Sequence, residues 1–534
     1  MNRPICYLIT IFLCLCVANL SAEIVNIALQ KQGATEWTQL AHDAQRTGWT
    51  PEVVSTPWRF KWLRSDVDAR SQYSMYPITG NGKVYITAAN NNVYALNLSN
   101  GQNAWAVAPG GTLNSTPAYD PDTQSLFVCS SNGNLYKLNT SNGSTIGTFN
   151  AGSALDTAPL IVGDRVYVTA NNGTLFAINK NTMQKIWQYD VVPGTWTINR
   201  VTAPSYSATR DIIIYCTDQD LHVRAVRSNG TLAWDVKPTV NDWRSWTGGG
   251  WTGQQQIEFR HGWPMVADNA GIVLVRLCLG YDSLEVGGGA PMPKTNAEIK
   301  QLLINNPQHQ AVFALDLDDG SKAFIPAIKN GAYGDGYLGI GPMLCIRTLP
   351  NGKQVVYTVY CNGQVCESMG WCDYREDSTI GEMVLDNTTV PGYEAGDCRF
   401  FDWMQQGIQT DEQGPISGAG DMVFFAHWDW PSEGIQITDR SDSVGWPLSN
   451  PIKGTWTPWV VTENSSGCGC SPGGSSHYCS NNTCAENAGR WGPPGFFVGD
   501  SGWHLYPYTI VSSSHVIVKS ISATIFVMEH GNPY

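Results

Sequence analysis

One short phrase recurs along the chain and constrains the fold more than any other feature. Each copy reads as two alternating apolar runs around a turn, and most turns carry Asn-Gly or Asp-Gly, the usual signature of an antiparallel hairpin. A supersecondary unit repeated at a period of about 40 residues indicates a solenoid, an array or a propeller. The copies are VYALNLSNGQNAW (93–105), LYKLNTSNGSTIG (135–147), LFAINKNTMQKIW (175–187), VRAVRSNGTLAW (223–234) and VFALDLDDGSKAF (312–324).

A further short apolar run precedes each hairpin set and begins near a proline. Helical spacing is clear only at 295–306, inside an insertion. Eight such starts predict eight four-stranded units, and an all-β chain of this kind closes most readily as a propeller. We therefore expect an all-β, eight-bladed β-propeller of four-stranded antiparallel blades. The prolines are Pro77, Pro117, Pro159, Pro204, Pro264, Pro342, Pro415 and Pro507.

The last unit suggests how the ring closes. Only three strand-like runs follow Pro507, whereas WRFKW (58–62) resembles a fourth strand without a unit of its own. We expect this N-terminal strand to complete the last blade. As a free strand instead, it would leave an unpaired apolar edge at both ends of the chain.

The recurring phrase resembles the PQQ-like repeat, with the approximate pattern G-x-[VL]-Y-A-L-D-x-x-T-G-x-x-x-W. The segment EWTQLAHDAQRTGWTPE (36–52) also resembles the lead-in found in secreted proteins of this class. The resemblance implies that the aromatic residue of one blade packs between the alanine and glycine region of a neighbouring blade. Matching positions are Ala95, Gly101 and Trp105; Ala177 and Trp187, with Met183 in place of glycine; Ala225, Gly230 and Trp234; and Ala314, Gly320 and Phe324.

The resemblance also brings in an enzymatic alternative. Quinoprotein alcohol dehydrogenases of this superfamily hold PQQ over the axis with calcium, a catalytic aspartate and a disulfide between adjacent cysteines. This chain has no Cys-Cys dipeptide and no C-x-x-C-H haem attachment. We therefore predict no cofactor and no metal, and PQQ with calcium is the runner-up. Calcium at the turns 120–122 and 316–319 is a weaker reading than solvated turn carboxylates.

The N-terminus of the chain predicts an exported protein, and the net charge restricts its partners. A charged start and an apolar run ending near Ala22 resemble a signal peptide over 1–22; a membrane anchor is the alternative. A lead-in (23–57) and the propeller (58–534) would follow. The formal net charge of −13 disfavours nucleic acid as a partner, and no later stretch predicts membrane insertion. We expect the mature protein to be secreted.

Long loops are predicted on one face, where strand two joins strand three and where strand four leaves the blade. Most of the 21 tryptophans lie in or beside these segments. Indole rings in loops either pack together or bind a planar ligand such as a sugar. The candidate ligand-binding residues form two clusters: Trp246, Trp251, Arg260, His261 and Trp263; and His427, Trp428, Asp429, Trp430 and Glu433.

Of 15 cysteines, three precede Ala22, and the remaining twelve are compatible with disulfides in an exported protein. Cys468, Cys470, Cys479 and Cys484 crowd the loop 463–486, where two local disulfides are favoured over a zinc site with His477. Further disulfide candidates are Cys361, Cys366, Cys372 and Cys398, whereas Cys129, Cys216 and Cys278 are expected to be buried thiols in second strands.

Nine Asn-x-Ser/Thr sequons follow the predicted signal peptide and are candidate glycosylation sites. They begin at Asn97, Asn114, Asn139, Asn142, Asn172, Asn229, Asn387, Asn464 and Asn481. With no enzymatic signature, we expect a binding or scaffold protein that holds an extracellular glycan or protein on its Trp-rich loops. A carbohydrate-active lyase or hydrolase and a structural subunit of an extracellular assembly stay open as alternatives.

Overall fold

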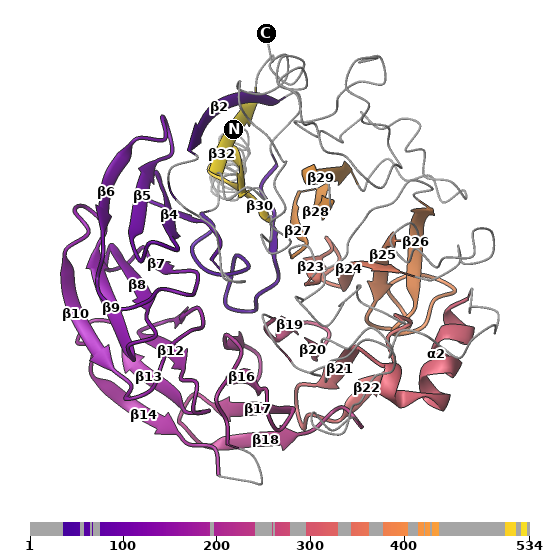
Figure 1. Ribbon diagram of the computed structural model, residues 1–534. Coiled ribbons are helices and arrows are strands. Elements are labelled where there is room, and N and C mark those ends of the chain that lie inside the picture. Colours follow the sequence, from indigo (N-terminus) through magenta and orange to yellow (C-terminus); the bar gives the residue numbers. More distant parts are fainter. Residues whose placement is uncertain are drawn as a thin grey trace, which may run out of the picture.

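Eight four-stranded sheets surround a central axis in the computed structural model (Figure 1). The fold is the predicted eight-bladed β-propeller. No helix among the described residues is long and apolar enough to cross a bilayer. The structure describes residues 36–53, 58–64, 67, 75–192, 197–240, 259, 262–277, 295–328, 343–361, 378–403, 415–420, 422–427, 430–436, 508–519 and 525–530.

In blades 1 to 4, consecutive strands of the chain are neighbours in the sheet, so each blade is an antiparallel meander. Blade 1 contains β3 (Ile78–Gly80), β4 (Lys83–Thr87), β5 (Val93–Asn97) and β6 (Asn103–Val107). Blade 2 contains β7 (Ala118–Asp120), β8 (Ser125–Cys129), β9 (Asn134–Asn139) and β10 (Thr145–Asn150). Blade 3 contains β11 (Leu160–Val162), β12 (Arg165–Thr169), β13 (Leu175–Asn179) and β14 (Lys185–Tyr189). Blade 4 contains β15 (Ser205–Ser207), β16 (Ile212–Thr217), β17 (His222–Arg227) and β18 (Leu232–Val236).

Blades 5 and 6 follow the same order. Blade 5 contains β19 (Met265–Ala267), β20 (Ile272–Arg276), β21 (Val312–Asp316) and β22 (Lys322–Phe324). Blade 6 contains β23 (Cys345–Thr348), β24 (Gln354–Cys361), β25 (Ser378–Val384) and β26 (Cys398–Trp403). Blade 7 contributes β27 (Ser417–Ala419), β28 (Met422–His427) and β29 (Trp430–Gln436). The fourth strand of that sheet is β1 (Trp49–Thr50), which pairs with β27 in parallel. This parallel inner strand departs from the prediction of purely antiparallel blades.

The burial of the strands explains why the repeat looks as it does. The three inner strands of a blade are covered on both faces by neighbouring blades, and β4 and β5 are buried at nearly every position. The outer strand β6 is half exposed, and only Trp105 is buried in it. Continuous apolar runs therefore mark inner strands, and the tryptophan marks the outer strand.

The ring is closed by the N-terminal strand, as the sequence predicts. Blade 8 contains β30 (Tyr508–Ser512), β31 (His515–Lys519) and β32 (Ile525–His530), and β2 (Trp58–Arg64) is its fourth strand. The antiparallel register runs from Trp58 opposite His530 to Arg64 opposite Ile525. The indigo strand β2 and the yellow strand β32 therefore lie side by side in one sheet (Figure 1).

Each tryptophan of the repeat joins its blade to the next one. Trp105 lies opposite Ala95 in its own blade. Its ring packs on Gly143 of blade 2, and its Nε1 donates to the Thr140 carbonyl oxygen at 2.9 Å. A side chain at Gly143 would collide with that ring, which explains why the repeat places glycine there. The expected packing is thus confirmed for the glycine, whereas the alanine belongs to the same blade as the tryptophan.

The predicted helical segment forms α2 (Asn296–Asn305), the one α-helix among the described residues. Thr295 and Glu298 form a capping box at its N-terminus. Lys300 Nζ lies 2.6 Å from Asp397 Oδ1, and the Asn296 side-chain amide donates to the Cys398 carbonyl oxygen at 3.0 Å. This part of the insertion therefore contacts blade 6 at the turn between β25 and β26. That turn lies on the face opposite the one where the long loops are predicted.

Candidate functional site

The two faces of the propeller are built from different connections. Turns between the second and third strands lie beside the segments that leave the fourth strands, as in the hydrogen bond from Leu113 N to Asn91 Oδ1 at 3.2 Å. We call this the loop face. The remaining turns form the opposite turn face, where Leu98 N donates to the Gly82 carbonyl oxygen at 2.9 Å.

Residues 36–53 of the lead-in run inside the ring and contact every blade in order, from blade 1 to blade 8 (Figure 1). At its two ends, Glu36 and Glu52 accept hydrogen bonds from turn-face backbone amides of blades 1 and 8. The segment therefore belongs to the wall of the ring. Its hydrogen bonds to the first strands are Thr79 N to Trp37 O, Tyr119 N to Thr38 O, Ile161 N to Gln39 Oε1, Tyr206 N to Ala44 O, Val266 N to Gln45 O, Ile346 N to Thr47 O and Gly418 N to Gly48 O.

Arg46 anchors the middle of the lead-in. Its side chain is fully buried and donates to the carbonyl oxygens of Leu40 (2.8 Å), Pro159 (3.1 Å) and Pro204 (3.1 Å). Burial lowers the pKa of the Arg46 guanidinium to about 9, against the opposing effect of the Asp43 carboxylate. The guanidinium therefore joins the lead-in to blades 3 and 4.

Aromatic rings from distant blades meet near the axis. The ring of Tyr76 lies 4.8 Å from that of Tyr508 and 6.4 Å from that of Trp263, and Tyr508 also contacts Trp37. Lys519 lies over the Tyr76 ring at 5.2 Å, and burial lowers the pKa of its amine to about 7. Trp263 is only 3% exposed, so this predicted ligand residue belongs to the core.

The other predicted ligand residues divide into two groups. Trp246, Trp251, Arg260 and His261, with Trp428 and Asp429, lie outside the described residues. The strands β28 and β29 form a hairpin that pairs His427 with Trp430 and Phe425 with Glu433. Since this is the connection between the second and third strands of blade 7, the backbone of His427 and Trp430 lies at the loop-face end of the hairpin.

A surface of side-chain amides covers the loop face of blades 1 to 3. The hydroxyl of Tyr94 accepts from Asn90 Nδ2 at 2.8 Å, and that of Tyr136 accepts from Asn132 Nδ2 at 2.8 Å. This repetition follows from turns of similar sequence in consecutive blades, AANNN, SSNGN and ANNGT. We call it the amide surface: Asn90, Asn91, Asn92, Asn114, Asn132, Asn134, Asn150, Asn171 and Asn172.

Asp156 joins three parts of this surface. Its Oδ1 accepts from Asn114 Nδ2 at 3.0 Å and from Ser131 Oγ at 2.5 Å, and its Oδ2 accepts from Asn171 Nδ2 at 2.7 Å. The sequence alone does not predict this arrangement, because Asn-rich turns are equally typical of hairpin connections. Their recurrence at one position of successive blades was the signal that could have revealed it.

The part of the amide surface on blades 1 and 2 belongs to a stretch of sequence with few charged residues. Between Lys83 and Asp156 the sequence contains only three charged residues, Asp120, Asp122 and Lys137. The two carboxylates each lie 2.8 Å from Lys180 Nζ, and Lys137 Nζ donates to the Lys180 carbonyl oxygen at 2.7 Å. These contacts belong to the turn face. On the loop face, the Asp156 carboxylate lies within the amide surface, and at blade 3 the exposed Asp190 accepts from Thr174 Oγ1 at 2.9 Å.

Blade 4 carries a charged cluster at the loop-face ends of β17 and β18. Arg224, 4% exposed, donates to Asp235 Oδ2 (3.1 Å) and Asp220 Oδ2 (2.6 Å), and His222 Nδ1 lies 2.6 Å from Asp235 Oδ1. Burial opposes the charge on Asp235, but the contacts with His222 and Arg224 outweigh it and lower the pKa of Asp235. The cluster therefore holds a histidine–aspartate pair.

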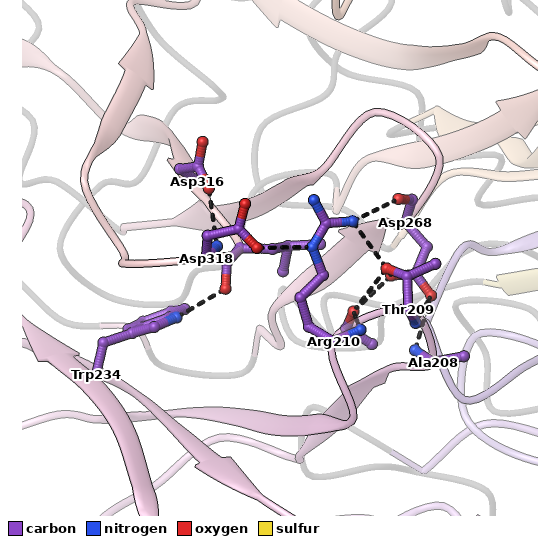
Figure 2. A network of polar contacts seen from close by, with 9 residues as sticks. Ala208, Thr209, Arg210, Trp234, Asp268, Asp316 and Asp318 are labelled. Carbon is purple, nitrogen blue, oxygen red and sulfur yellow. Dashed lines mark hydrogen bonds and ion pairs between the residues drawn. The ribbon is translucent and has the colours of Figure 1, made fainter.

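The turn carboxylates proposed as weak calcium candidates have protein partners. Arg210 Nε donates to Asp318 Oδ1 at 3.0 Å, and Asp316 Oδ1 accepts from Asp318 N at 2.8 Å. Figure 2 shows how Arg210 links Asp318 of blade 5 to Thr209 of blade 4 and to Asp268. These aspartates therefore join neighbouring blades on the turn face.

The described cysteines are buried thiols. Cys129 and Cys216 lie in second strands, as predicted, and Cys345 and Cys398 are also free. Cys398 begins β26 beneath α2, and burial raises the pKa of its thiol. Its assignment as a disulfide candidate is therefore wrong. The side chain of Cys361 and the whole of Cys278, Cys366, Cys372 and the 463–486 loop lie outside the described residues.

The sequons occupy both faces. Asn142, Asn172, Asn229 and Asn387 are exposed, whereas Asn97, Asn114 and Asn139 are half-buried. Asn114 Nδ2 makes two hydrogen bonds, which a glycan on that nitrogen would reduce. Asn464 and Asn481 lie outside the described residues, as does the predicted signal peptide.

The described residues do not fit PQQ with calcium. No three His, Cys, Asp or Glu side chains within the described ranges gather to hold a metal ion. At the axis, Trp263 packs edge-on against Tyr76 and is buried by the core. No step of the function proposed below therefore involves this cofactor.

Comparison with known proteins places these features in context. Residues 89–242 match the family model described as outer membrane protein assembly factor BamB. Quinohemoprotein alcohol dehydrogenase from Comamonas testosteroni has a similar fold, with a TM-score of 0.50 at 11% identity over 93% of this chain and 81% of that chain. The corresponding enzyme ADHIIG from Pseudomonas putida HK5 gives 0.50 at 12% identity, over 94% and 80%.

BamB from Moraxella catarrhalis gives a TM-score of 0.48 at 11% identity, over 89% of this chain and all of that chain. No curated protein matches the chain significantly. At these identities the solved structures establish the fold only. The repeats at 89–242 match that family model, and the two alcohol dehydrogenase structures show that the chain shares their β-propeller fold.

Proposed function

We propose that the protein is a secreted binding or scaffold propeller that holds an extracellular glycan or protein on its loop face. The observation that carries this proposal is the difference between the two faces. Short turns tied to neighbouring blades form the turn face, and the lead-in occupies the inside of the ring. The connecting end of the β28–β29 hairpin and the amide surface belong to the loop face, and the sequence predicts that most long connections leave the blades on the same face.

A rigid scaffold with elaborated loops on one face is the usual arrangement of a binding protein. The lead-in contributes to that rigidity because its hydrogen bonds tie the inner strands of all eight blades to one segment. A non-enzymatic role also agrees with the family model that matches residues 89–242, whose description is that of an assembly factor.

The test is surface plasmon resonance on residues 23–534 made in a secretory host. The immobilised protein is exposed to neutral and charged polysaccharides and to purified extracellular-matrix proteins. We expect saturable binding by at least one of these and its loss on replacing both Trp428 and Trp430 by alanine. Binding that survives this change, with the fold intact by circular dichroism, would remove the 427–433 cluster from the site. No binding to any of them would contradict the proposal.

The histidine–aspartate pair of blade 4 favours one second candidate, a carbohydrate-active hydrolase or lyase on the same face. With Nδ1 held by Asp235, His222 Nε2 is the nitrogen left to accept a proton, and the structure gives it no partner. A general base needs this arrangement. Glycan cleavage that is abolished by His222→Gln, with glycan binding unchanged, would establish the second candidate over the first.

A further inference from the structure

We propose that the ligand of the loop face is an uncharged oligosaccharide and that it lies on the amide surface of blades 1 to 3. This inference rests on the proposed function and deepens it by naming the chemistry of the ligand. It also moves the site from the tryptophan clusters that the sequence favours to a sector where neutral hydrogen-bonding groups gather.

The lack of cationic side chains at the loop face of blades 1 and 2 is the first step. An anionic or cationic ligand is recognised by charged side chains, since charge-assisted hydrogen bonds are the strong ones. In blades 1 and 2, Asp120, Asp122 and Lys137 contact Lys180 on the turn face, and Lys83 begins β4 at the same face. Asp156 lies within the amide surface, where its two oxygens accept three hydrogen bonds from Asn114, Ser131 and Asn171. Beside Asn172, the exposed Asp190 accepts from Thr174 Oγ1 at 2.9 Å. On blades 1 and 2 the surface therefore offers no cationic group to an anionic ligand, and the Asp156 oxygens are already engaged by protein donors.

The second step is the hydrogen-bonding capacity that remains. A side-chain amide both donates and accepts, which matches a sugar hydroxyl, itself a donor and an acceptor. Asn172 Oδ1 accepts from Thr174 N at 3.2 Å, which leaves its Nδ2 group unpartnered in the structure. Asn91 Oδ1 likewise accepts from Leu113 N, and its Nδ2 is free. Both amides are thus fixed by one contact and open for another.

Rigidity is the third step. Asn134 donates to the Tyr136 hydroxyl at 3.1 Å and accepts from Asn150 Nδ2 at 2.7 Å, so each amide orients the next. The backbone at Gly110 and Gly111 packs directly on Tyr136 and Asn132, with no room for a side chain. Groups held in place before binding lose little conformational entropy when a ligand arrives.

The chain supplies a closely matched pair of variants for the test. Asn172 begins an Asn-Gly-Thr turn on the loop face, and Asn142 begins an Asn-Gly-Ser turn on the turn face. Both side chains are exposed, and in both the Oδ1 accepts from the backbone amide two residues later, at 3.2 Å and 3.0 Å. Replacement by aspartate keeps that bond, adds one negative charge and removes one sequon in each case.

We would titrate residues 23–534, Asn172→Asp and Asn142→Asp with neutral gluco- and manno-oligosaccharides, heparin, polygalacturonate and chitosan oligomers by isothermal calorimetry. We expect neutral oligosaccharides to bind and Asn172→Asp to weaken them about tenfold, equivalent to about 1.4 kcal/mol. Asn142→Asp should change the Kd by less than about twofold. Equal effects of the two variants would overturn the location.

The remaining outcomes separate this inference from the proposed function. Saturable binding of only charged oligosaccharides, or of a matrix protein alone, would overturn the neutral ligand while leaving a binding propeller in place. Neutral binding that Asn172→Asp leaves intact and that the Trp428 and Trp430 changes abolish would return the site to the tryptophan cluster. Failure of all probes, with both variants folded, would overturn the inference and the proposed function together.

Discussion

Met183 of blade 3 occupies the space that Gly147 of blade 2 leaves open. A Cβ atom built on Gly147 would lie 2.7 Å from Met183 Cγ. The position equivalent to Gly147 is a tryptophan in blades 1, 3 and 4. In the blade that follows each of these, the position equivalent to Met183 is the glycine on which that tryptophan ring packs. At the interface between blades 2 and 3, the large and the small residue are therefore exchanged relative to these other interfaces. Met183 keeps the positive φ of the glycines, 58°.

This exchange predicts strong coupling between the two positions. Met183→Gly should lower the free energy of unfolding by about 2 kcal/mol, because it leaves a cavity against Gly147. Gly147→Trp alone should cost about 3 kcal/mol or more through overpacking. The double variant should come within about 1 kcal/mol of the parent, since it restores the arrangement of the neighbouring blades. The free energies of unfolding of the three variants are measured by guanidinium unfolding, monitored by circular dichroism rather than by tryptophan fluorescence.

Ile146→Trp serves as the control, because Ile146 is 52% exposed on the same outer strand and a tryptophan there meets no neighbouring blade. It should change the free energy of unfolding by no more than about 0.5 kcal/mol. Additive effects of the two interface substitutions would show that Gly147 and Met183 do not compensate for each other.

Arg46→Met should destabilise the protein by about 3–5 kcal/mol. Methionine fills similar space but donates no hydrogen bond, so the buried carbonyl oxygens of Leu40, Pro159 and Pro204 lose their shared donor. Differential scanning calorimetry compares this variant with Arg227→Met, whose exposed guanidinium bonds one carbonyl oxygen. A similarly small shift of the unfolding temperature in both variants would mean that Arg46 does not anchor the lead-in.

Much of the fold was predictable because the blades repeat. Hairpin turns and a tryptophan at fixed spacing recur with each unit, and the missing strand of the last unit pointed to β2. The path of the lead-in was not predictable. It depends on hydrogen bonds between residues such as Gln45 and Val266, which lie far apart in the chain and follow no periodic pattern. The exchange at Met183 was visible as a departure from the repeat, but its partner Gly147 became clear only in three dimensions.

The candidate site, like the fold, could be predicted from the sequence only in part. The sequence singles out tryptophans in long loops because indole rings are rare there, and His427 and Trp430 are paired in the backbone register of a loop-face hairpin. The amide surface has no unusual residue type, since asparagine is ordinary in turns. Its meaning lies in the convergence of Asn114, Ser131 and Asn171 on Asp156, and these residues come from three different connections.

Two carboxylates of the network in Figure 2 should differ strongly in importance. Asp268 is 8% exposed and accepts from Ser207 Oγ, from Ala208 N and from both Thr209 N and Oγ1. Asp268→Ala should cost about 2–4 kcal/mol because these donors lose their acceptor between blades 4 and 5.

Asp318→Ala is the matched comparison. Its carboxylate is 69% exposed and pairs with Arg210, so its removal should cost no more than about 0.5 kcal/mol. Urea unfolding of both variants at one ionic strength gives the comparison. Equal losses of unfolding free energy in the two variants would contradict the conclusion that buried hydrogen bonds, rather than the surface ion pair, hold blades 4 and 5 together.

The closing blade should weaken as the pH falls. His515 Nδ1 lies 2.6 Å from the Ser513 carbonyl oxygen, so Nε2 accepts from Lys61 Nζ at 2.9 Å. Burial and the Lys61 charge lower the pKa of His515, against the effects of Ser513 and Glu529. The unfolded histidine titrates near pH 6.5 and therefore binds its proton first. Stability is thus complete above about pH 6.5 and is lost as the pH falls toward the folded pKa.

His515→Gln should remove that part of the pH dependence, because glutamine accepts from Lys61 without titrating. Midpoints of thermal unfolding between pH 7.5 and 4.5 measure the effect, and His530→Gln at the exposed end of β32 is the control. Since Lys61 belongs to the N-terminal strand and His515 to the C-terminal hairpin, protonation places two positive charges where the chain closes its ring. An unchanged pH profile in His515→Gln would mean that the closure does not respond to this histidine.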